Sequence, residues 1–480
     1  MTLSAAFHTA VSGLAAGARL ADLTAGNIAN ALTEGYGRRE LGLASQTAGQ
    51  GVRVLGVTRQ MQPPLVQDLR LANAALGAHD REAEALRSLD AAFGRDGDTG
   101  AFAARLASLE RSLIEASARP ESTTRLTAAV DAAQAVVQSF AKVSQTITQI
   151  RQDADRAIAR DLDALSVALD GVARLNGQIA ATAARGEDAS GLVDQRQKLV
   201  DDMAPLVALR EVARPGGQIA LFTTSGVTLL DGQRRATLGF TPTRSVTPET
   251  TLANGLVSGL SVDGQPVSTG PEGGRFGPGA ISAAFALRDE GAPARQRQLD
   301  ALAANLATRF ADPALDPSLA SGAAGLFTDA GGPVDPTQTT GLAGRLRLNP
   351  ALDPQAGGAV WRLRDGLGAT QPSAQTDPAR LQGMASALSR PEVMTDLGAR
   401  GGMSDLAAEL HSLIATDRLR AEGTQSYSRA HRDILSQNLQ AMGVDTDREM
   451  QLLLQIEQAY GANARVVRAI DDMMRTILEI

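Results

Sequence analysis

The stretch 443–480, GVDTDREMQLLLQIEQAYGANARVVRAIDDMMRTILEI, carries a helical pattern up to its last residue. Its apolar positions recur at alternating spacings of three and four residues, which predicts a helix that packs along another helix. We expect this helix to be capped by Thr446, with Glu449 completing a capping box. The seam consists of Leu453, Ile456, Tyr460, Asn463, Val467, Ile470, Met474 and Ile477. Its single polar member, Asn463, is the type of residue that fixes register in coiled coils.

The other end of the chain repeats this pattern. Residues 1–30 carry a seam with the same alternation, formed by Leu3, Phe7, Ala10, Leu14, Gly17, Ala21, Thr24 and Ile28. Nothing adjacent in sequence covers either seam. We therefore predict that the two terminal helices pair as a coiled coil and that the remaining domains are inserted between them.

The part that follows the first helix changes character twice. In AGNIANALTEGYGRRE, residues 25–40, asparagines and glycines supply turn chemistry, and alternating apolar residues over 41–57 predict a hairpin. Helical periodicity then resumes, and from 99 to 206 the chain is long-helical, with breaks expected at Pro120 and at 186–191. A single helix over 121–185 would be roughly 95 Å long, which predicts a rod. Its apolar residues follow heptad spacing at Val136, Phe140, Val143, Ile147 and Ile150 and, after a one-residue slip, at Leu162, Leu165, Leu169, Val172 and Ile179.

Beyond the rod, residues 207–276 alternate as short strands separated by Pro-Gly and Asp-Gly turns, and they end in a glycine- and proline-rich cluster. Residues 277–312 return to helix. The stretch 313–376 lacks sustained periodicity and is interpreted as irregular surface structure, and helical character persists from about 377 to 442.

These patterns predict a mainly α fold with β-rich insertions, divided into three parts. The terminal helical domain comprises 1–32 and 443–480. A long helical-bundle rod domain comprises 33–206, 277–312 and 377–442. A small outer β-rich domain comprises 207–276 and 313–376.

Composition excludes several classes of function. The formal net charge of −7 provides no basic surface for nucleic acid, and the absence of cysteine excludes disulfides and thiolate metal sites. The N-terminal sequence MTLSAAFHTAVSGL has neither the basic patch nor the continuous apolar core of a secretory signal, and no stretch is long enough to span a membrane. We expect no nucleic-acid partner and no membrane insertion.

The sequence contains no recognisable catalytic constellation. The four histidines lie far apart, and neither a zinc-binding HExxH motif nor a GxSxG nucleophile elbow is present. The glycine-rich GPEGGRFGPG lacks the Lys-Ser or Lys-Thr of a phosphate loop and is interpreted as a linker. We predict that the protein is not an enzyme and that it needs no cofactor or metal.

Several motifs together resemble the rod, hook and hook-associated proteins that form the axis of the bacterial flagellum. The stretch TAGNIANALTEGYGRRE is similar to their N-terminal motif, with Asn27, Asn30, Gly35 and Tyr36 at its characteristic places. The segment LNGQIAATAARGEDASGLVDQRQKLV resembles the long-helix turn of the hook-associated branch, including Asn176, Asp194 and Arg196, and the last helix resembles the closing helix of the family. One departure is ADPALDPSLA after the helix that ends in ATRF, where the family has a histidine-containing motif.

The resemblance implies a structural subunit, secreted to the flagellum, that joins hook to filament. It implies a ring of identical subunits in contact with the hook protein and the second junction protein. It also implies export by the flagellar type III system with the help of an export chaperone. Two alternatives remain: another axial flagellar protein, or a secreted adhesin or enzyme with flagellar-type ends.

Overall fold

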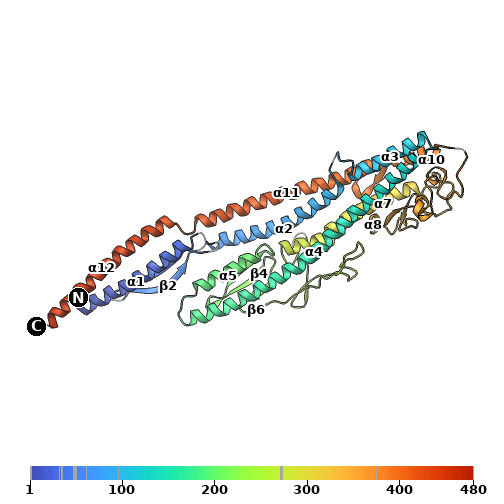
Figure 1. Cartoon of the computed structure of the whole chain (residues 1–480). Coiled ribbons are helices and arrows are strands. Elements are labelled where there is room, and N and C mark those ends of the chain that lie inside the picture. Colours follow the sequence, from blue (N-terminus) through green and yellow to red (C-terminus); the bar gives the residue numbers. More distant parts are fainter. Residues whose placement is uncertain are drawn as a thin grey trace.

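The computed structural model describes residues 3–31, 33, 36–46, 51–60, 62–95, 97–270, 274–374 and 376–478. The molecule is elongated, and long helices run along most of its length, with both chain ends at the same tip (Figure 1). It is mostly helical with small antiparallel sheets, which confirms this part of the prediction.

The tip of the molecule is formed by the two terminal helices and a hairpin. Helices α1 (Leu3–Ala29) and α12 (Thr446–Leu478) lie side by side (Figure 1). Strands β1 (Arg39–Ser45) and β2 (Val52–Arg59) form an antiparallel hairpin against α1, with a bulge at Gly42/Leu43. The predicted pairing partners are thus neighbours; their winding as a coiled coil stays a prediction.

The rod consists of two helix pairs. Helix α2 (Pro63–Phe93) lies along α11 (Met403–Ala441), and α3 (Phe102–Ala118) packs on α4 (Thr123–Ala184). Both expected breaks are present. Around Pro120, α3 ends at Ala118 and α4 begins at Thr123; near 186–191, α4 ends at Ala184 and α5 begins at Ser190. At 62 residues, α4 is about 93 Å long.

The remaining helices and strands pack on the rod helices or on one another. Their bounds are as follows: α5 Ser190–Met203, β3 Leu209–Ala213, β4 Ile219–Thr223, β5 Thr228–Asp231, β6 Arg234–Arg235, β7 Leu238–Gly239, β8 Leu260–Val262, β9 Gln265–Val267, α6 Ala280–Ala286, α7 Ala292–Phe310, β10 Phe327–Asp329, α8 Leu342–Arg345, β11 Leu346–Leu348, α9 Arg362–Asp365, α10 Ala379–Ser389, β12 Glu392–Met394 and β13 Ala399–Gly401. A π-helical turn at Leu287–Gly291 joins α6 to α7.

Two hydrophobic clusters lie along α4, and the predicted heptads divide between them. Val136 and Phe140 belong to the first cluster, together with side chains from α3, α7, α10 and α11. Leu162 and Leu165 belong to the second, with side chains from α5, α6 and the strands β3, β4, β5 and β8. The one-residue slip in the heptad pattern falls between the clusters, where α4 buries polar side chains.

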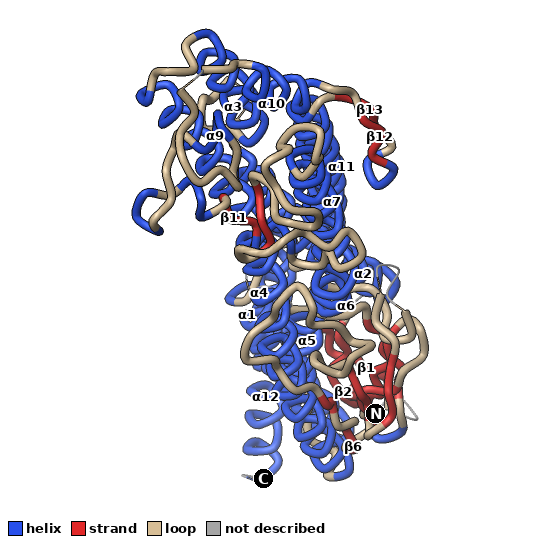
Figure 2. Tube along the Cα trace, turned by 90° about the vertical axis from the view of Figure 1, so that its right-hand side faces the viewer, coloured by secondary structure: helices blue, strands red, loops and turns tan. Residues whose placement is uncertain are grey.

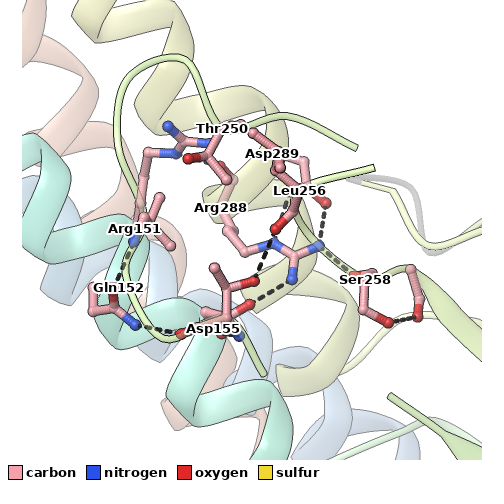
Figure 3. A network of polar contacts seen from close by, with 11 residues as sticks. Arg151, Gln152, Asp155, Thr250, Leu256, Ser258, Arg288 and Asp289 are labelled. Atoms are coloured by element: carbon pink, nitrogen blue, oxygen red, sulfur yellow. Dashed lines mark hydrogen bonds and ion pairs between the residues drawn. The ribbon is translucent and has the colours of Figure 1, made fainter. Parts of the chain in front are cut away.

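A buried arginine network occupies this gap (Figure 3). Arg288 is fully buried and donates from Nη1 to Asp155 on α4 (2.7 Å), while its other nitrogens donate to Asp289 and to the carbonyl of Ser258. Arg151 donates from Nε to the carbonyl of Arg288 (2.9 Å). Arg151 also donates to the carbonyls of Thr247 and Thr250, so the network attaches the chain around 247–258 to the rod. These carbonyls supply the several acceptors that a buried guanidinium needs.

The segment 313–376 differs from its predicted place. We expected it to share one outer domain with 207–276, but the two segments belong to different clusters. Leu326, Phe327, Leu342 and Leu346 are buried in the first cluster, whereas the sheet β3–β4–β5–β6 covers the second. Figure 2 shows β11 and α9 far from β6 along the molecule. The interpretation as surface structure is therefore wrong for these buried residues.

Candidate assembly site at the paired termini

The two terminal helices run antiparallel in one register, which small residues of α1 set. A Cβ on Gly13 would lie 2.7 Å from Nδ2 of Asn463, and a Cβ on Gly17 would lie 3.6 Å from the Tyr460 ring. The predicted register residue Asn463 thus lies against a glycine of the opposite helix. Gly17 belongs to the predicted seam, whereas Gly13 lies outside its three- and four-residue spacing, although both small residues allow a close approach of the helices.

At the other end of the pair, Asn27 is the centre of a polar cluster. Its side chain is 1% exposed. Its Nδ2 donates to Oε2 of Glu449 on α12 (3.0 Å) and to the carbonyl of Arg39 (2.9 Å). Its Oδ1 accepts from the Tyr36 hydroxyl (2.9 Å) and from the Arg39 amide (3.0 Å). Both N–H groups and both acceptor positions of the Asn27 side-chain amide are therefore used, as burial requires.

Glu449 connects the C-terminal helix to the N-terminal motif. It is 1% exposed, and its Oε1 accepts from Nε of Arg38 (2.6 Å). A buried carboxylate is stable only when it is paired and hydrogen-bonded, and Asn27 and Arg38 meet this need. Burial raises the pKa of Tyr36, with the carboxylates of Asp194 and Glu449 acting in the same direction. Tyr36 therefore stays a neutral hydrogen-bond donor.

The capping box predicted for α12 is wrong. The amides of Asp447 and Arg448 donate to Oδ1 of Asp445 at 3.0 and 3.1 Å, so Asp445 caps the helix and Thr446 is its first residue. Glu449 lies one position beyond the third helical residue and faces α1. Its carboxylate therefore makes a tertiary contact with the N-terminal motif.

The same cluster continues into the rod. Arg39 donates to Asp194 of α5, Nε of Arg59 on β2 lies 2.8 Å from the same carboxylate, and the Arg39 guanidinium lies 5.1 Å from the Tyr36 ring centre. Two arginines of the hairpin thus meet one acidic residue of the rod. From the sequence, Asp194 could be singled out only through the family resemblance, because no local pattern links α5 to a hairpin so far away in the chain.

The remaining predicted residues divide by exposure. Ile456 and Ile470 are buried at 6% and 5%. Six others are half-buried, namely Leu3, Leu14, Ile28, Leu453, Asn463 and Val467. Four are exposed by 41% or more, namely Phe7, Tyr460, Met474 and Ile477. Asn30 is half-buried and its Nδ2 donates to the carbonyl of Gly26, so it stabilises the end of α1, whereas Gly35 lies outside the described residues.

A second polar anchor fixes the outer sheet. Asn176 on α4 is fully buried; its Nδ2 donates to the carbonyls of Ile219 and Gly232, and its Oδ1 accepts from the Ile219 amide and from Nη1 of Arg196. Arg196 also donates to the carbonyl of Gly217 (2.7 Å). These two residues, which the resemblance had singled out, hold the sheet on α4 and α5.

For metal or small-molecule binding, the described residues offer a cavity in the rod but no cluster of metal ligands. No group of three or more histidine, cysteine or acidic side chains there could hold a metal ion. A cavity of about 480 Å³ between α2, α4, α7 and α11 has mostly apolar walls, and its lining includes the Arg295–Asp417 ion pair together with Glu82 and Thr424. Within the described ranges, no helix has both the length and the hydropathy of a membrane span.

Comparison with known proteins gives these features a family. A family model described as the flagellar hook-associated protein FlgK helical domain matches residues 86–313. A second model, described as the flagellar basal body rod FlgEFG protein C-terminal, matches 435–480, which includes all of α12. The two matches span α3 to α7 and the terminal helix α12, and both indicate an axial protein of the bacterial flagellum.

Individual relatives narrow this class. Flagellar hook-associated protein 1 of Bacillus subtilis (strain 168) is 25% identical over 98% of this chain and 97% of its own length. Its counterpart in Escherichia coli (strain K12) is 23% identical over 57% of this chain and 52% of its own length. Over nearly its whole length the chain is thus similar to flagellar hook-associated protein 1, which confirms the family resemblance predicted from its motifs.

A solved structure of the flagellar hook junction protein FlgK from Burkholderia pseudomallei is also similar. It is 20% identical, covers 55% of this chain and 46% of its own, and aligns with a TM-score of 0.42. The assignment to the family rests on the sequence matches.

Proposed function

We propose that the protein is the structural subunit that joins the hook to the filament, and that it assembles through α1 and α12. Besides the family resemblance, the proposal rests on one observation about the terminal helices. The paired terminal helices are held together by a buried polar cluster, yet they leave large apolar side chains in water. In this function the protein has no catalytic role.

The apolar part of α12 is too wide for one partner helix. At about 100° per residue, the side that faces α1 and its apolar neighbours span roughly 200° of the helix, whereas a helix packed on one neighbour needs about half of that. Val466, Met473, Met474 and Ile477 are all 45% or more exposed. A helix that is apolar over so much of its surface becomes stable when further helices cover it, which neighbouring subunits would provide.

The terminal pair would then be loosely held in the free chain and would become fully ordered on assembly. Near Glu449 the pair has its buried contacts, whereas towards Phe7 and Ile477 it has few. We expect hydrogen exchange of the free chain to be fast toward the tip and to slow on assembly. Strong protection throughout both helices in the free chain would contradict this coupling.

In this role the partners would be identical subunits in a ring, the hook protein and the second junction protein. The chain would reach the flagellum through the type III export system, with an export chaperone bound before secretion. The relative in Bacillus subtilis, matched over nearly the whole of both chains, supports this role. The match of 435–480 to a family of rod proteins keeps another axial position as the second candidate.

Deletion of the encoding gene tests the proposed function. The expected phenotype is hooks without filaments, with filament subunits released into the medium, and motility restored by the wild-type gene. Normal swimming of the deletion strain would overturn the proposal. Loss of the hook itself would instead assign the chain to the rod or hook. A secreted adhesin with flagellar-type ends would leave both hook and filament in place.

A further inference from the structure

The outward surfaces of the terminal helices carry two uncharged strips that α1 and α12 do not use for each other. The first, the α1 strip, consists of Ser4, Phe7, Val11, Ala15 and Ala18, all exposed. The second, the α12 flank, consists of Ala459, Ala462, Val466, Ala469, Met473 and Ile477, also all exposed. Both follow three- and four-residue spacing, so at about 100° per residue each occupies an arc of roughly 80° on its helix.

We propose that the α12 flank of one subunit binds the α1 strip of a second copy of this chain. The inference rests on the proposed function, because it names the surface through which the subunits of the ring meet. Each strip presents bulky side chains next to small ones. In the proposed contact, Phe7 and Val11 of one copy fit between Val466 and Met473 of the next. This is the knobs-into-holes arrangement of paired helices.

Charge is the main reason to choose these partners. The α1 helix has no acidic or basic side chain before Arg19 apart from His8. The charged residues of the C-terminal half of α12 lie outside the flank. Measured from its centre, Arg465 and Asp472 fall about 80° and 100° away, Arg468 about 140°, and Asp471 and Arg475 about 160°. An uncharged strip loses little hydration when it meets another uncharged strip, whereas burying an unpaired charge costs several kcal/mol.

Length and symmetry agree with this choice. The α1 strip is about 21 Å long and the α12 flank about 27 Å, so the shorter strip can be covered completely. Because the two strips are different surfaces, the contact is head-to-tail, and such contacts generate rings or helical arrays. Pairing of two identical α12 flanks would instead stop at a dimer.

Crosslinking in assembled flagella tests the contact, and the absence of cysteine from the chain makes introduced thiols unique. Two variants, Val11→Cys and Val466→Cys, carry tags of different size and are produced together in cells that lack the natural gene. Hook–filament complexes are isolated and treated with a short bismaleimide, which tolerates a small error in register. We expect a mixed dimer of the two variants.

The control replaces Val466→Cys by Arg468→Cys, which places the thiol on the charged side of the same helix. The proposal predicts loss of the mixed dimer in this control. Dimers of Val466→Cys with itself, or no mixed dimer in complexes that contain both variants, would overturn the proposed contact. Filaments that remain attached in such cells would leave the junction function intact, whereas absence of both variants from the complexes would count against that function itself.

Discussion

Glu449→Ala would separate the two ends of the chain. Glu449 is 1% exposed and bonded to Arg38 at 2.6 Å and to Asn27 at 3.0 Å. Removal of one member of a buried ion pair costs about 3–5 kcal/mol, and the lower end applies because Arg38 keeps Glu40 as a partner. At about 1.4 kcal/mol per tenfold change, the opening of the α1–α12 pair becomes up to roughly a hundredfold more frequent.

Hydrogen exchange of the purified chain measures this opening at the amides of 21–29 and 446–456. Glu449→Gln keeps the shape and one acceptor and loses the charge, so its protection falls by about tenfold. The control is Glu457→Gln, an exposed position on the same helix, which leaves protection unchanged. Equal protection of these amides in Glu449→Ala and in the control would refute the role of Glu449 as the link between the termini.

Three further changes test the rod and its outer sheet. Asp155→Ala leaves the fully buried Arg288 with one carboxylate fewer and lowers stability by about 3 kcal/mol, seen as a lower calorimetric transition temperature. Asn176→Ala removes the anchor of β4 and costs about 2 kcal/mol, so protection of β4 amides falls while that of α3 is unchanged. Burial raises the pKa of Asp300 to about 6 despite hydrogen bonds from two amides and Gln296. The folded state therefore favours the protonated form, and the stability contributed by this group falls by up to about 3 kcal/mol as pH rises from 4 to 6. Transition temperatures measured across this pH range should show this decline in the wild-type protein, and Asp300→Asn should flatten it.

The helices of the rod could be predicted from the sequence because their information is local. The long helix α4 was expected at 121–185 and runs from Thr123 to Ala184. Its heptads predicted the buried residues, and the slip in the pattern marked the place where polar side chains are buried. The family could be recognised for the same reason, since its motifs are contiguous stretches of the chain.

Tertiary contacts were harder to predict. The role of Glu449 was assigned to the start of its own helix, because sequence shows a neighbour three residues away and not Asn27, which is 422 residues away. Phe7 fits the seam pattern but is 41% exposed, whereas Gly17 of the same seam and the neighbouring Gly13 are positions where α1 comes close to α12. The segment 313–376 lacks periodicity, yet it fills the first cluster through contacts with distant helices.

Locating the protein within the flagellum is the most direct test of its proposed role. Electron microscopy of isolated hook–filament complexes, labelled with antibodies against the outer sheet around 207–276, would locate the chain. We expect a single band of label at the boundary between hook and filament, absent from complexes prepared from the deletion strain. Label along the hook or the filament, or on the cell surface without either, would contradict the proposal that this chain forms the junction.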